Sequence, residues 1–329
     1  MVLFLILIVS VCAVGYVIFF RTVIAQEILP ALRNAIVFEE PDPPLQLEHG
    51  EPKEPIGATT PAESVDRVER RETVANDPPA RERELPKVAI IIDDMGYDEV
   101  TGHKLLDLPI ALTYSFLPFA PHTKKLENIA YSRGKNIFLH LPLQPKGTAY
   151  SPGPGALYLQ DPPELQRMKL ERCLREVPNA IGVNNHMGSS FTEDKKAMTN
   201  IIQDMKTRSL IFVDSVTSPG SVAFRVAQAA ALQSARRNVF LDNVQDERKI
   251  CGQLEKLVEL AERNGGAIGI AHPYQATVNA LAKCGEKYLT RVEYVGVPEF
   301  IAANDTLEIA QRRSSPLARG RGRDALASP

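Results

Sequence analysis

The sequence has no tryptophan, only 4 cysteines and almost no net charge. No C-x-x-C pair is present, which excludes a zinc ribbon and a dense disulfide framework. The 38 Lys and Arg residues nearly balance the 40 Asp and Glu residues. No basic surface large enough for a polyanion is implied, so we exclude nucleic acid as a partner. The missing tryptophan disfavours a stacking platform for long sugar chains.

Nucleotide-binding loops are also missing. No G-x-G-x-x-G or G-x-x-x-x-G-K-[ST] pattern follows any apolar run. These loops hold phosphates on backbone N–H groups at the start of a helix, so their absence disfavours a dinucleotide or P-loop protein.

The chain opens with an uncharged apolar stretch, residues 2–20, followed by Arg21. At about 1.5 Å per residue this stretch can cross a hydrocarbon core. It has no basic start and no clear small-x-small cleavage site, and Val11 before Cys12 does not fit a lipoprotein box. We predict an uncleaved transmembrane helix over residues 1–22. Taken literally, the single flanking Arg21 favours a cytoplasmic C-terminal side, but this bias rests on very few charges.

Composition separates the rest into three parts. Residues 23–86 are rich in Pro and Glu and carry few apolar residues over 41–86, which predicts a semi-extended linker. Residues 304–329 form a basic tail that we expect to be disordered. Residues 87–303 form the folded domain.

Short apolar runs alternate with helix-like stretches in the folded domain. The runs are residues 88–92, 110–116, 136–141, 180–183, 210–213, 239–241, 267–271 and 292–297. Continuous apolar runs are typical of strands buried on both faces of a parallel sheet. The predicted helices are 123–133, 163–176, 194–208, 221–235, 246–264 and 275–284. A standard eight-fold barrel needs about 250 residues, so an irregular seven-stranded barrel or an open doubly wound sheet fits better.

Local sequence also predicts where some helices begin and end and what the cysteines do. Asp194 and Ser221 are N-cap candidates, and Gly134 and Gly265 are helix stops. The other cysteines fall within predicted helices, and we interpret them as small buried apolar residues rather than a redox pair. They are Cys173, Cys251 and Cys284.

Polar residues gather where the predicted strands end. These residues are Asp93, Asp94, His140, Asn185, His186, Asp214, Ser215, Asp242, His272 and Tyr274. In parallel β/α folds, functional groups collect at the C-terminal ends of the strands. Histidine with carboxylate and no cysteine suits Zn²⁺ or another divalent ion with positions left open for water. We therefore expect one metal site there.

Each of these residues also has a structural explanation. An Asp at a strand end often caps the next helix, and Asp242 could pair with Arg236 or Arg237. Adjacent Asp93 and Asp94 are harder to explain, because two like charges need a cation or a proton to offset them. The histidines away from strand ends are interpreted as surface residues; they are His49, His103 and His122.

Six motifs in order resemble the divergent polysaccharide deacetylase family, a relative of the NodB-type carbohydrate deacetylases. They are Ile91-Ile92-Asp93-Asp94-Met95-Gly96, His140-Leu141-Pro142-Leu143-Gln144, Asn185-His186-Met187-Gly188-Ser189, Val213-Asp214-Ser215-Val216-Thr217, Val239-Phe240-Leu241-Asp242-Asn243 and Ala271-His272-Pro273. The resemblance implies a distorted (β/α)7 barrel with a divalent metal, Zn²⁺ being the first choice. It also implies a single-pass protein of the bacterial inner membrane with its folded domain in the periplasm, and this outweighs the charge bias.

The resemblance also implies roles for single residues. Asp93 would be the general base, Asp94 a metal ligand and His272, in a variant of the Leu-x-His motif, the general acid. The H-x-x-x-H turn and the Arg-x-Pro-Tyr motif of the NodB-type enzymes are missing here. His140 and His186, from neighbouring strands, are the natural substitutes as ligands.

The leading hypothesis is therefore a metal-dependent hydrolase that removes acetyl groups from an envelope polysaccharide or a peptidoglycan-like glycan. Substrate would be bound by residues that share the same mouth, namely Asn185, Asp214, Ser215, Asp242 and Tyr274. Asp214 could instead orient His272.

Two other classes remain open. The same mouth could belong to a non-catalytic module that binds a glycan or a cell-wall partner. A glycosidase could use Asp93 with Asp214 or Asp242 and no metal. A phosphatase of the D-x-D-x-T type is disfavoured because Asp93 and Asp94 are adjacent.

Overall fold

The computed structural model describes residues 84–304. The predicted membrane helix and basic tail, and nearly all of the linker, lie outside these residues. Within residues 84–304 no helix is both long enough and apolar enough to cross a bilayer. The proposed domain boundaries therefore stay a prediction.

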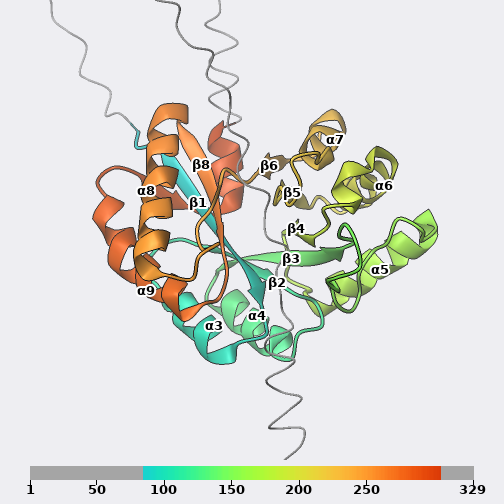
Figure 1. Cartoon of the computed structure of the whole chain (residues 1–329), viewed down its shortest axis with the longest axis horizontal. Helices are drawn as coiled ribbons and strands as arrows, with labels where there is room; N and C mark the ends of the chain where they lie inside the picture. The colour runs from blue at the N-terminus through green and yellow to red at the C-terminus, as the bar shows by residue number, and fades with distance from the viewer. Residues whose placement is uncertain (1–83, 305–329) are drawn as a thin grey trace, which may run out of the picture.

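One curled sheet of parallel strands forms the centre of the fold (Figure 1). Its strands are β1 (Lys87–Met95), β2 (Thr113–Phe116), β3 (Asn136–Leu143), β4 (Gly182–Met187), β5 (Ile211–Asp214), β6 (Ser234–Arg236), β7 (Val239–Phe240), β8 (Gly266–Ala271) and β9 (Glu293–Val295). Their order is β6-β5-β4-β3-β2-β1-β8-β7, and β9 pairs with β1. Every pairing is parallel, so all the carboxyl ends of the strands lie at one end of the sheet.

The helices cover the outer, convex side of the curl (Figure 1). They are α3 (Glu99–Leu106), α4 (Thr123–Ser132), α5 (Pro163–Glu176), α6 (Lys195–Lys206), α7 (Ala223–Ala229), α8 (Glu247–Asn264) and α9 (Gln275–Gly285), with the short 3-10 helices η2 (Phe191–Glu193) and η3 (Glu286–Tyr288). Asp194 caps α6 through a bond from the Ala197 amide, as predicted. Gly265 ends α8 with φ 84°, also as predicted.

Alternation along the strands divides the core in two. One set of strand side chains packs under the helices, and Val88, Ile90 and Ile92 of β1 belong to it. The alternate set, which includes Ile91, Phe138, Val213, Ile268 and Ile270, fills the inside of the curl. Both faces are buried, which is why the strands read as continuous apolar runs.

The sheet does not close into a complete barrel. Strands β6 and β7 are the two ends of the strand order, and in the described part of the chain they do not pair with each other. This incomplete closure confirms the distorted β/α barrel expected from the sequence. The loops at the carboxyl ends therefore surround an open mouth.

Two expectations about the outer layer were wrong. The predicted helix 221–235 ends early, because α7 stops at Ala229, and Ser234–Arg236 forms strand β6. An alanine-rich stretch suits a helix, but Ala231 adopts φ 53° and ends it. The second error concerns Cys251 and Cys284, which form a disulfide between α8 and α9, with Cα atoms 5.8 Å apart.

Candidate active site

Along each strand, every second side chain faces the inside of the curl. The polar residues at the mouth continue these series of inward-facing side chains. On β3, His140 follows Phe138 by two residues, and directly after β8, His272 follows Ile270 by two. Side chains two apart share a face, so both imidazoles point into the curl above the inner core. On β4, Asn184 pairs in register with His140, and His186 pairs with Pro142. Because alternate residues of a strand share a face, these side chains all lie at one opening.

Adjacent Asp93 and Asp94 reach the mouth by a break in this alternation. Asp93 continues the inward-facing series of Ile91, so a regular strand would turn Asp94 toward the helices. Asp94 instead has φ 53°, and the register between β1 and β2 shifts between Ile92 and Met95. Such a bulge re-aims a side chain, and a left-handed non-glycine residue is strained and concentrates at functional sites. Both carboxylates consequently serve the same opening.

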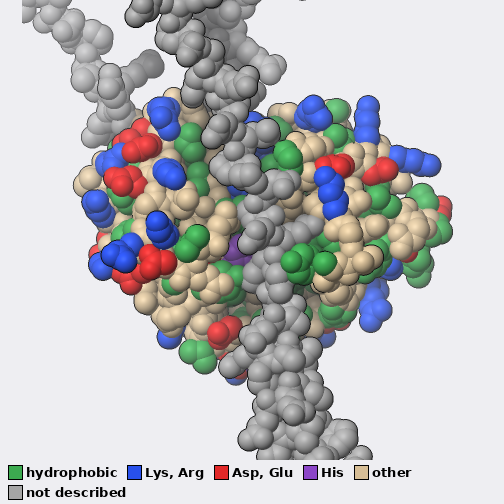
Figure 2. Space-filling model, viewed as in Figure 1, with side chains coloured by type: hydrophobic (Ala, Val, Ile, Leu, Met, Phe, Trp, Pro, Cys, Tyr) green, Lys and Arg blue, Asp and Glu red, His purple; other side chains and the backbone are tan. Residues whose placement is uncertain are grey.

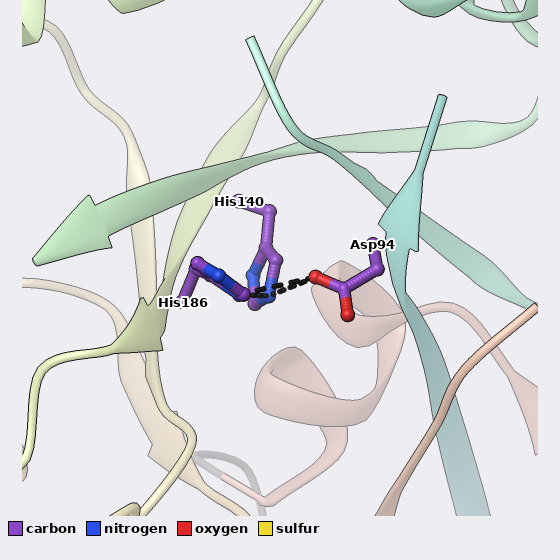
Figure 3. A group of neighbouring side chains, drawn as sticks. All are labelled: Asp94, His140 and His186. Carbon is purple, nitrogen blue, oxygen red and sulfur yellow. Dashed lines mark hydrogen bonds and ion pairs between the residues drawn. The ribbon is translucent and has the colours of Figure 1, made fainter. Parts of the chain in front are cut away.

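Three side chains from three strands converge on one point (Figure 3). Asp94 Oδ1 lies 3.2 Å from His140 Nε2 and 3.1 Å from His186 Nδ1. The two ring nitrogens are 3.2 Å apart. All three residues are buried, and their possible ligand atoms lie within 4.8 Å of one another. The structure thus brings together the predicted ligands Asp94, His140 and His186.

The chemistry of this triad fits a divalent cation. Asp94 Oδ2 is buried and, among the described residues, accepts no hydrogen bond, although a buried carboxylate oxygen normally has a partner. Ligands at about 2.1 Å from a metal are separated by roughly 3.0 Å in octahedral and 3.4 Å in tetrahedral geometry. The observed separations of 3.1–3.2 Å fall between these values. We conclude that the donor set and its spacing suit an ion such as Zn²⁺.

The charges of the triad are strongly coupled. Burial alone would raise the pKa of Asp94, but His186 and His140 hold it well below its usual range. Burial would lower the pKa of His140, yet Asp93 and Asp94 raise it. Asp94 is therefore ionised, as a metal ligand must be.

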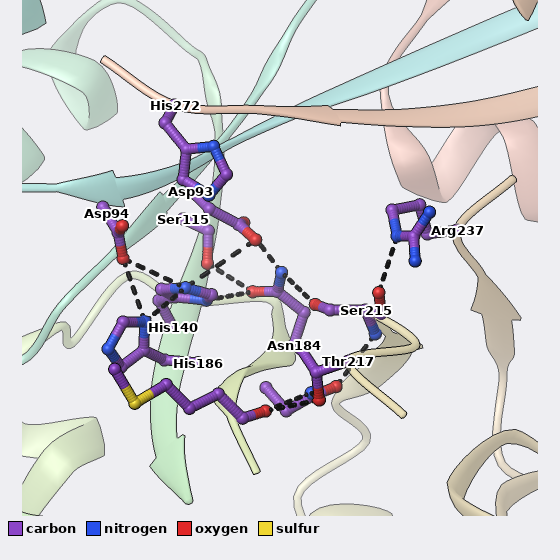
Figure 4. A network of polar contacts seen from close by, with 12 residues as sticks. Asp93, Asp94, Ser115, His140, Asn184, His186, Ser215, Thr217, Arg237 and His272 are labelled. Atoms are coloured by element: carbon purple, nitrogen blue, oxygen red, sulfur yellow. Dashed lines mark hydrogen bonds and ion pairs between the residues drawn. The ribbon is translucent and has the colours of Figure 1, made fainter. Parts of the chain in front are cut away.

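Asp93 lies beside the triad in a separate environment (Figure 4). Its Oδ1 accepts a hydrogen bond of 2.7 Å from Asn184 Nδ2, and its Oδ2 lies 3.7 Å from His140 Nε2. Burial raises the pKa of Asp93, despite the opposing effects of His140, His272 and Asn184. A carboxylate with a raised pKa next to a metal site is suited to accept a proton.

A second pair of residues occupies the other side of the mouth. Asp242 Oδ1 lies 2.9 Å from His272 Nδ1, and Asp242 Oδ2 accepts bonds from the His272 amide and from Thr277 Oγ1. Burial would lower the pKa of His272, but Asp242, with Asp94 and Asp93, raises it to about 9. His272 is consequently protonated at neutral pH and can donate a proton.

Aromatic rings line the side of the mouth that carries His272. The His272 ring stacks on Phe240 with centroids 5.9 Å apart and tilts against Tyr274 at 5.7 Å. Arg237 lies 3.9 Å above the Phe240 ring. Figure 2 shows one face of the molecule, with a histidine visible near its middle and charged side chains of both signs to either side. This wall offers apolar ring surface next to a proton donor.

The remaining predicted binding residues hold the loops together. Asn185 donates to the Met187 carbonyl and accepts from the Ser215 amide, which ties the end of β4 to the end of β5. Ser215 Oγ accepts a bond from Asn184. Their role in substrate binding stays a prediction.

Asp214 corrects one expectation. Its oxygens accept bonds from Val216 N, Ser221 Oγ and Phe224 N at the start of α7, so it caps that helix and does not orient His272. Phe212, two residues earlier, packs under the helices, so alternation directs Asp214 to the outer layer. The residue that orients His272 is Asp242, and the suggested pairing of Asp242 with Arg236 or Arg237 is not seen.

Sequence reasoning missed four residues of the site. Asn184 and Ser115 lie inside the network, Thr277 holds Asp242, and Arg237 donates to the carbonyls of Ser215 and Val216. Burial lowers the pKa of Arg237 to about 10, although Asp214 and Asp93 oppose this. Strand alternation could have indicated Asn184, because it lies two residues before His186.

Comparison with known proteins identifies relatives. A family profile described as divergent polysaccharide deacetylase matches residues 90–301. The uncharacterized protein YibQ of Escherichia coli is 37% identical over 206 residues, covering 59% of this chain and 61% of that protein. An uncharacterized protein of Haemophilus influenzae is 32% identical over 195 residues, covering 59% of this chain and 69% of that protein. The matched region thus spans about three fifths of the length of the Escherichia coli protein.

Solved structures of similar fold include another uncharacterized protein. The crystal structure of uncharacterized protein ATU2773 from Agrobacterium tumefaciens superposes with a TM-score of 0.63 at 29% sequence identity. The alignment covers 67% of this chain and 90% of that chain. The family profile and the six motifs therefore point to the same family.

Proposed function

The chain belongs to the divergent polysaccharide deacetylase family, and from this premise we propose that it is a metal-dependent hydrolase removing acetyl groups from a glycan of the bacterial envelope. The observation that carries the proposal is the convergence of Asp94, His140 and His186 beside a carboxylate and a protonated imidazole. A cation site flanked by one proton acceptor and one proton donor is suited to the hydrolysis of an acetyl group.

The metal would be held by Asp94 Oδ1, His140 Nε2 and His186 Nδ1, the three atoms that meet in the structure. A divalent ion bound there supplies Lewis-acid polarisation of the acetyl carbonyl and a lowered pKa for water. With three protein ligands, positions remain for water and substrate, as in catalytic zinc sites.

Asp93 would act as the general base. Its raised pKa favours accepting a proton, and Asn184 holds one of its oxygens. His272 would act as the general acid, because the nearby Asp242 keeps its ring protonated and fixes its orientation through Nδ1. The proton would pass from the ring to the departing amine or alcohol of the sugar.

The geometry favours this function over a two-carboxylate glycosidase. That mechanism needs Asp214 or Asp242 as a partner of Asp93. Asp214 caps α7, and both oxygens of Asp242 contact His272, one of them also accepting from Thr277. Neither carboxylate is left available to attack a sugar or activate water.

The disulfide supports a location outside the cytoplasm. The Cys251–Cys284 bridge joins α8 to α9, and such bridges persist mainly in oxidising compartments. We propose a periplasmic domain, held at the inner membrane by the apolar segment 2–20, that acts on peptidoglycan or a related polysaccharide.

The test is acetate release from N-acetylated peptidoglycan fragments and O-acetylated polysaccharide by the zinc-loaded protein. We expect turnover in the wild type, loss after chelation, recovery on adding zinc, and none in Asp93→Asn. Glycan binding without acetate release would support a non-catalytic binding module instead. Full activity in Asp93→Asn would refute the assignment of the base.

A further inference from the structure

Asn184 occupies the centre of the polar network at the mouth (Figure 4). It lies on β4 in register with His140 of β3, and it is completely buried. Its side chain contacts both the candidate base Asp93 and the candidate ligand His140.

The hydrogen bonds fix which way the Asn184 amide points. Its Oδ1 lies 2.5 Å from Ser115 Oγ and 3.1 Å from His140 Nδ1. Its Nδ2 donates to Asp93 Oδ1 at 2.7 Å and to Ser215 Oγ at 3.1 Å. Reversing the amide would place its oxygen against the Asp93 carboxylate, where neither atom carries a proton. All four bonding positions of the amide are thus occupied in only one orientation.

This orientation determines the tautomer of His140. An amide oxygen can only accept, so His140 Nδ1 must carry the proton that bonds to it. The neutral ring then has its lone pair on Nε2, the atom that faces Asp94 and His186. A ring held in the other tautomer would present an N–H to that point and could not bind a cation there.

We propose that Asn184 is a positioning residue that acts on both halves of the reaction: its oxygen sets His140 in the metal-binding tautomer, and its amino group holds the Asp93 carboxylate. This inference rests on the proposed function for its catalytic consequence. The effect on His140 is a property of the metal-free protein and can be measured without activity.

The test compares Asn184→Leu with Asn184→Asp. Leucine has a similar size but removes both contacts. Aspartate keeps an acceptor for His140 and removes the neutral donor to Asp93. The readouts are the tautomer of the neutral His140 ring, followed by nitrogen-15 NMR of the metal-free full-length protein up to a pH at which the ring has lost its second proton, zinc affinity by competition with a chelator, and kcat with zinc bound.

Asn184→Leu should lose the Nδ1–H state of His140 and bind zinc about 10- to 100-fold more weakly. Asn184→Asp should restore both properties, yet its kcat should stay at least about 10-fold below that of the wild type. An ionised carboxyl at this position repels Asp93 and no longer holds it in place, and a protonated carboxyl shares its proton with Asp93, so Asp93 is either displaced or already protonated.

Asn179→Leu is the matched control. Asn179 donates to the buried Glu127 from its amide and its side chain, near the opposite end of β4. This variant also deprives a buried carboxylate of a donor, so it controls for lost stability. It should keep the wild-type tautomer and zinc affinity.

The proposal is overturned if Asn184→Leu keeps the Nδ1–H state of His140 or the wild-type zinc affinity. It is also overturned if Asn184→Asp loses zinc affinity as strongly as Asn184→Leu. Should Asn184→Leu fail to fold, the Asn184→Asp variant still decides, since it must keep tautomer and affinity. If the wild type binds no zinc, the proposed function fails, while the tautomer measurement still decides the role of Asn184.

Discussion

The two sides of the mouth differ in how their buried carboxylates are balanced by hydrogen-bond donors. On the β1, β3 and β4 side, Asp94 Oδ2 is buried and accepts no hydrogen bond from residues 84–304, and two ring nitrogens face each other at 3.2 Å. On the β7 and β8 side, each oxygen of Asp242 contacts a donor from His272 or Thr277. The first arrangement is incomplete without a cation, whereas the second is complete with a proton.

The difference shows how one opening can serve two chemical tasks. A cation site needs lone pairs aimed at one point and no protons on them. A proton donor needs a carboxylate that keeps its histidine charged. Strands β1 and β8 are neighbours in the sheet, so the two environments lie side by side above one inner core. Substitutions on each side should therefore have different signatures.

Asp94→Ala should have the largest effect, because it removes the anionic ligand of the cation side. We expect the bound zinc to be lost and turnover to fall at least about 10³-fold, since the metal contributes several kcal/mol. Elemental analysis of dialysed protein and acetate release measure the two effects. His103→Ala, a surface histidine that pairs with Glu99, is the control and should retain zinc. Full zinc content in Asp94→Ala would contradict the assignment.

Asp93→Asn should separate chemistry from metal binding. The amide keeps the shape of Asp93 but cannot accept a proton, so turnover should fall about 10²- to 10⁴-fold. Zinc content should stay at the wild-type level, because Asp93 is not one of the three converging ligands. Loss of zinc together with activity would show that Asp93 belongs to the metal site.

Asp242→Asn should produce a smaller, pH-dependent effect. The wild-type His272 has a pKa of about 9, so it is protonated and active as an acid below that pH. Without the charge of Asp242, the pKa should fall toward its usual value of about 6.5. At pH 8 the protonated fraction would drop about 30-fold, while at pH 6 it would barely change. The pH profile of kcat tests this, and an unmoved alkaline limb would contradict it.

Removing the disulfide should affect stability more than chemistry. The Cys251–Cys284 bridge links residues 33 apart and joins the helices that follow Asp242 and His272. The double variant Cys251→Ser/Cys284→Ser should lose about 3 to 4 kcal/mol of unfolding free energy, measured by urea denaturation. Zinc content should not change, because the three candidate zinc ligands lie on β1, β3 and β4 and not on these two helices. An unchanged denaturation midpoint would show that the bridge adds no stability.

Much of the fold follows from the sequence. Continuous apolar runs predicted the parallel strands, and the polar residues directly after them predicted one mouth. The parallel order predicts that Asp94 and His186, more than ninety positions apart, lie at the same end of the sheet, but their contact also needs the bulge that turns Asp94 inward. Local patterns do not reveal closure, so the open edges at β6 and β7 needed the structure.

The site was less predictable, for reasons of side-chain direction. Asp214 and Asp242 look alike in the sequence, since each follows an apolar run. Only their position in the strand period separates them: Asp214 turns outward to cap α7, while Asp242 turns inward to His272. Strand alternation places Asn184 on the same face as His186, but only the structure shows its four hydrogen-bonded contacts. Cysteine spacing likewise cannot show that α8 and α9 lie side by side.

The most direct measurement of the central claim is X-ray absorption at the zinc edge of the reconstituted protein. We expect a zinc ion with two imidazole nitrogens and further oxygen ligands at about 2.0–2.2 Å. In His186→Ala, one imidazole should be lost from the shell. A protein that retains no zinc, or whose zinc shell contains no imidazole, would show that Asp94, His140 and His186 do not form a zinc site.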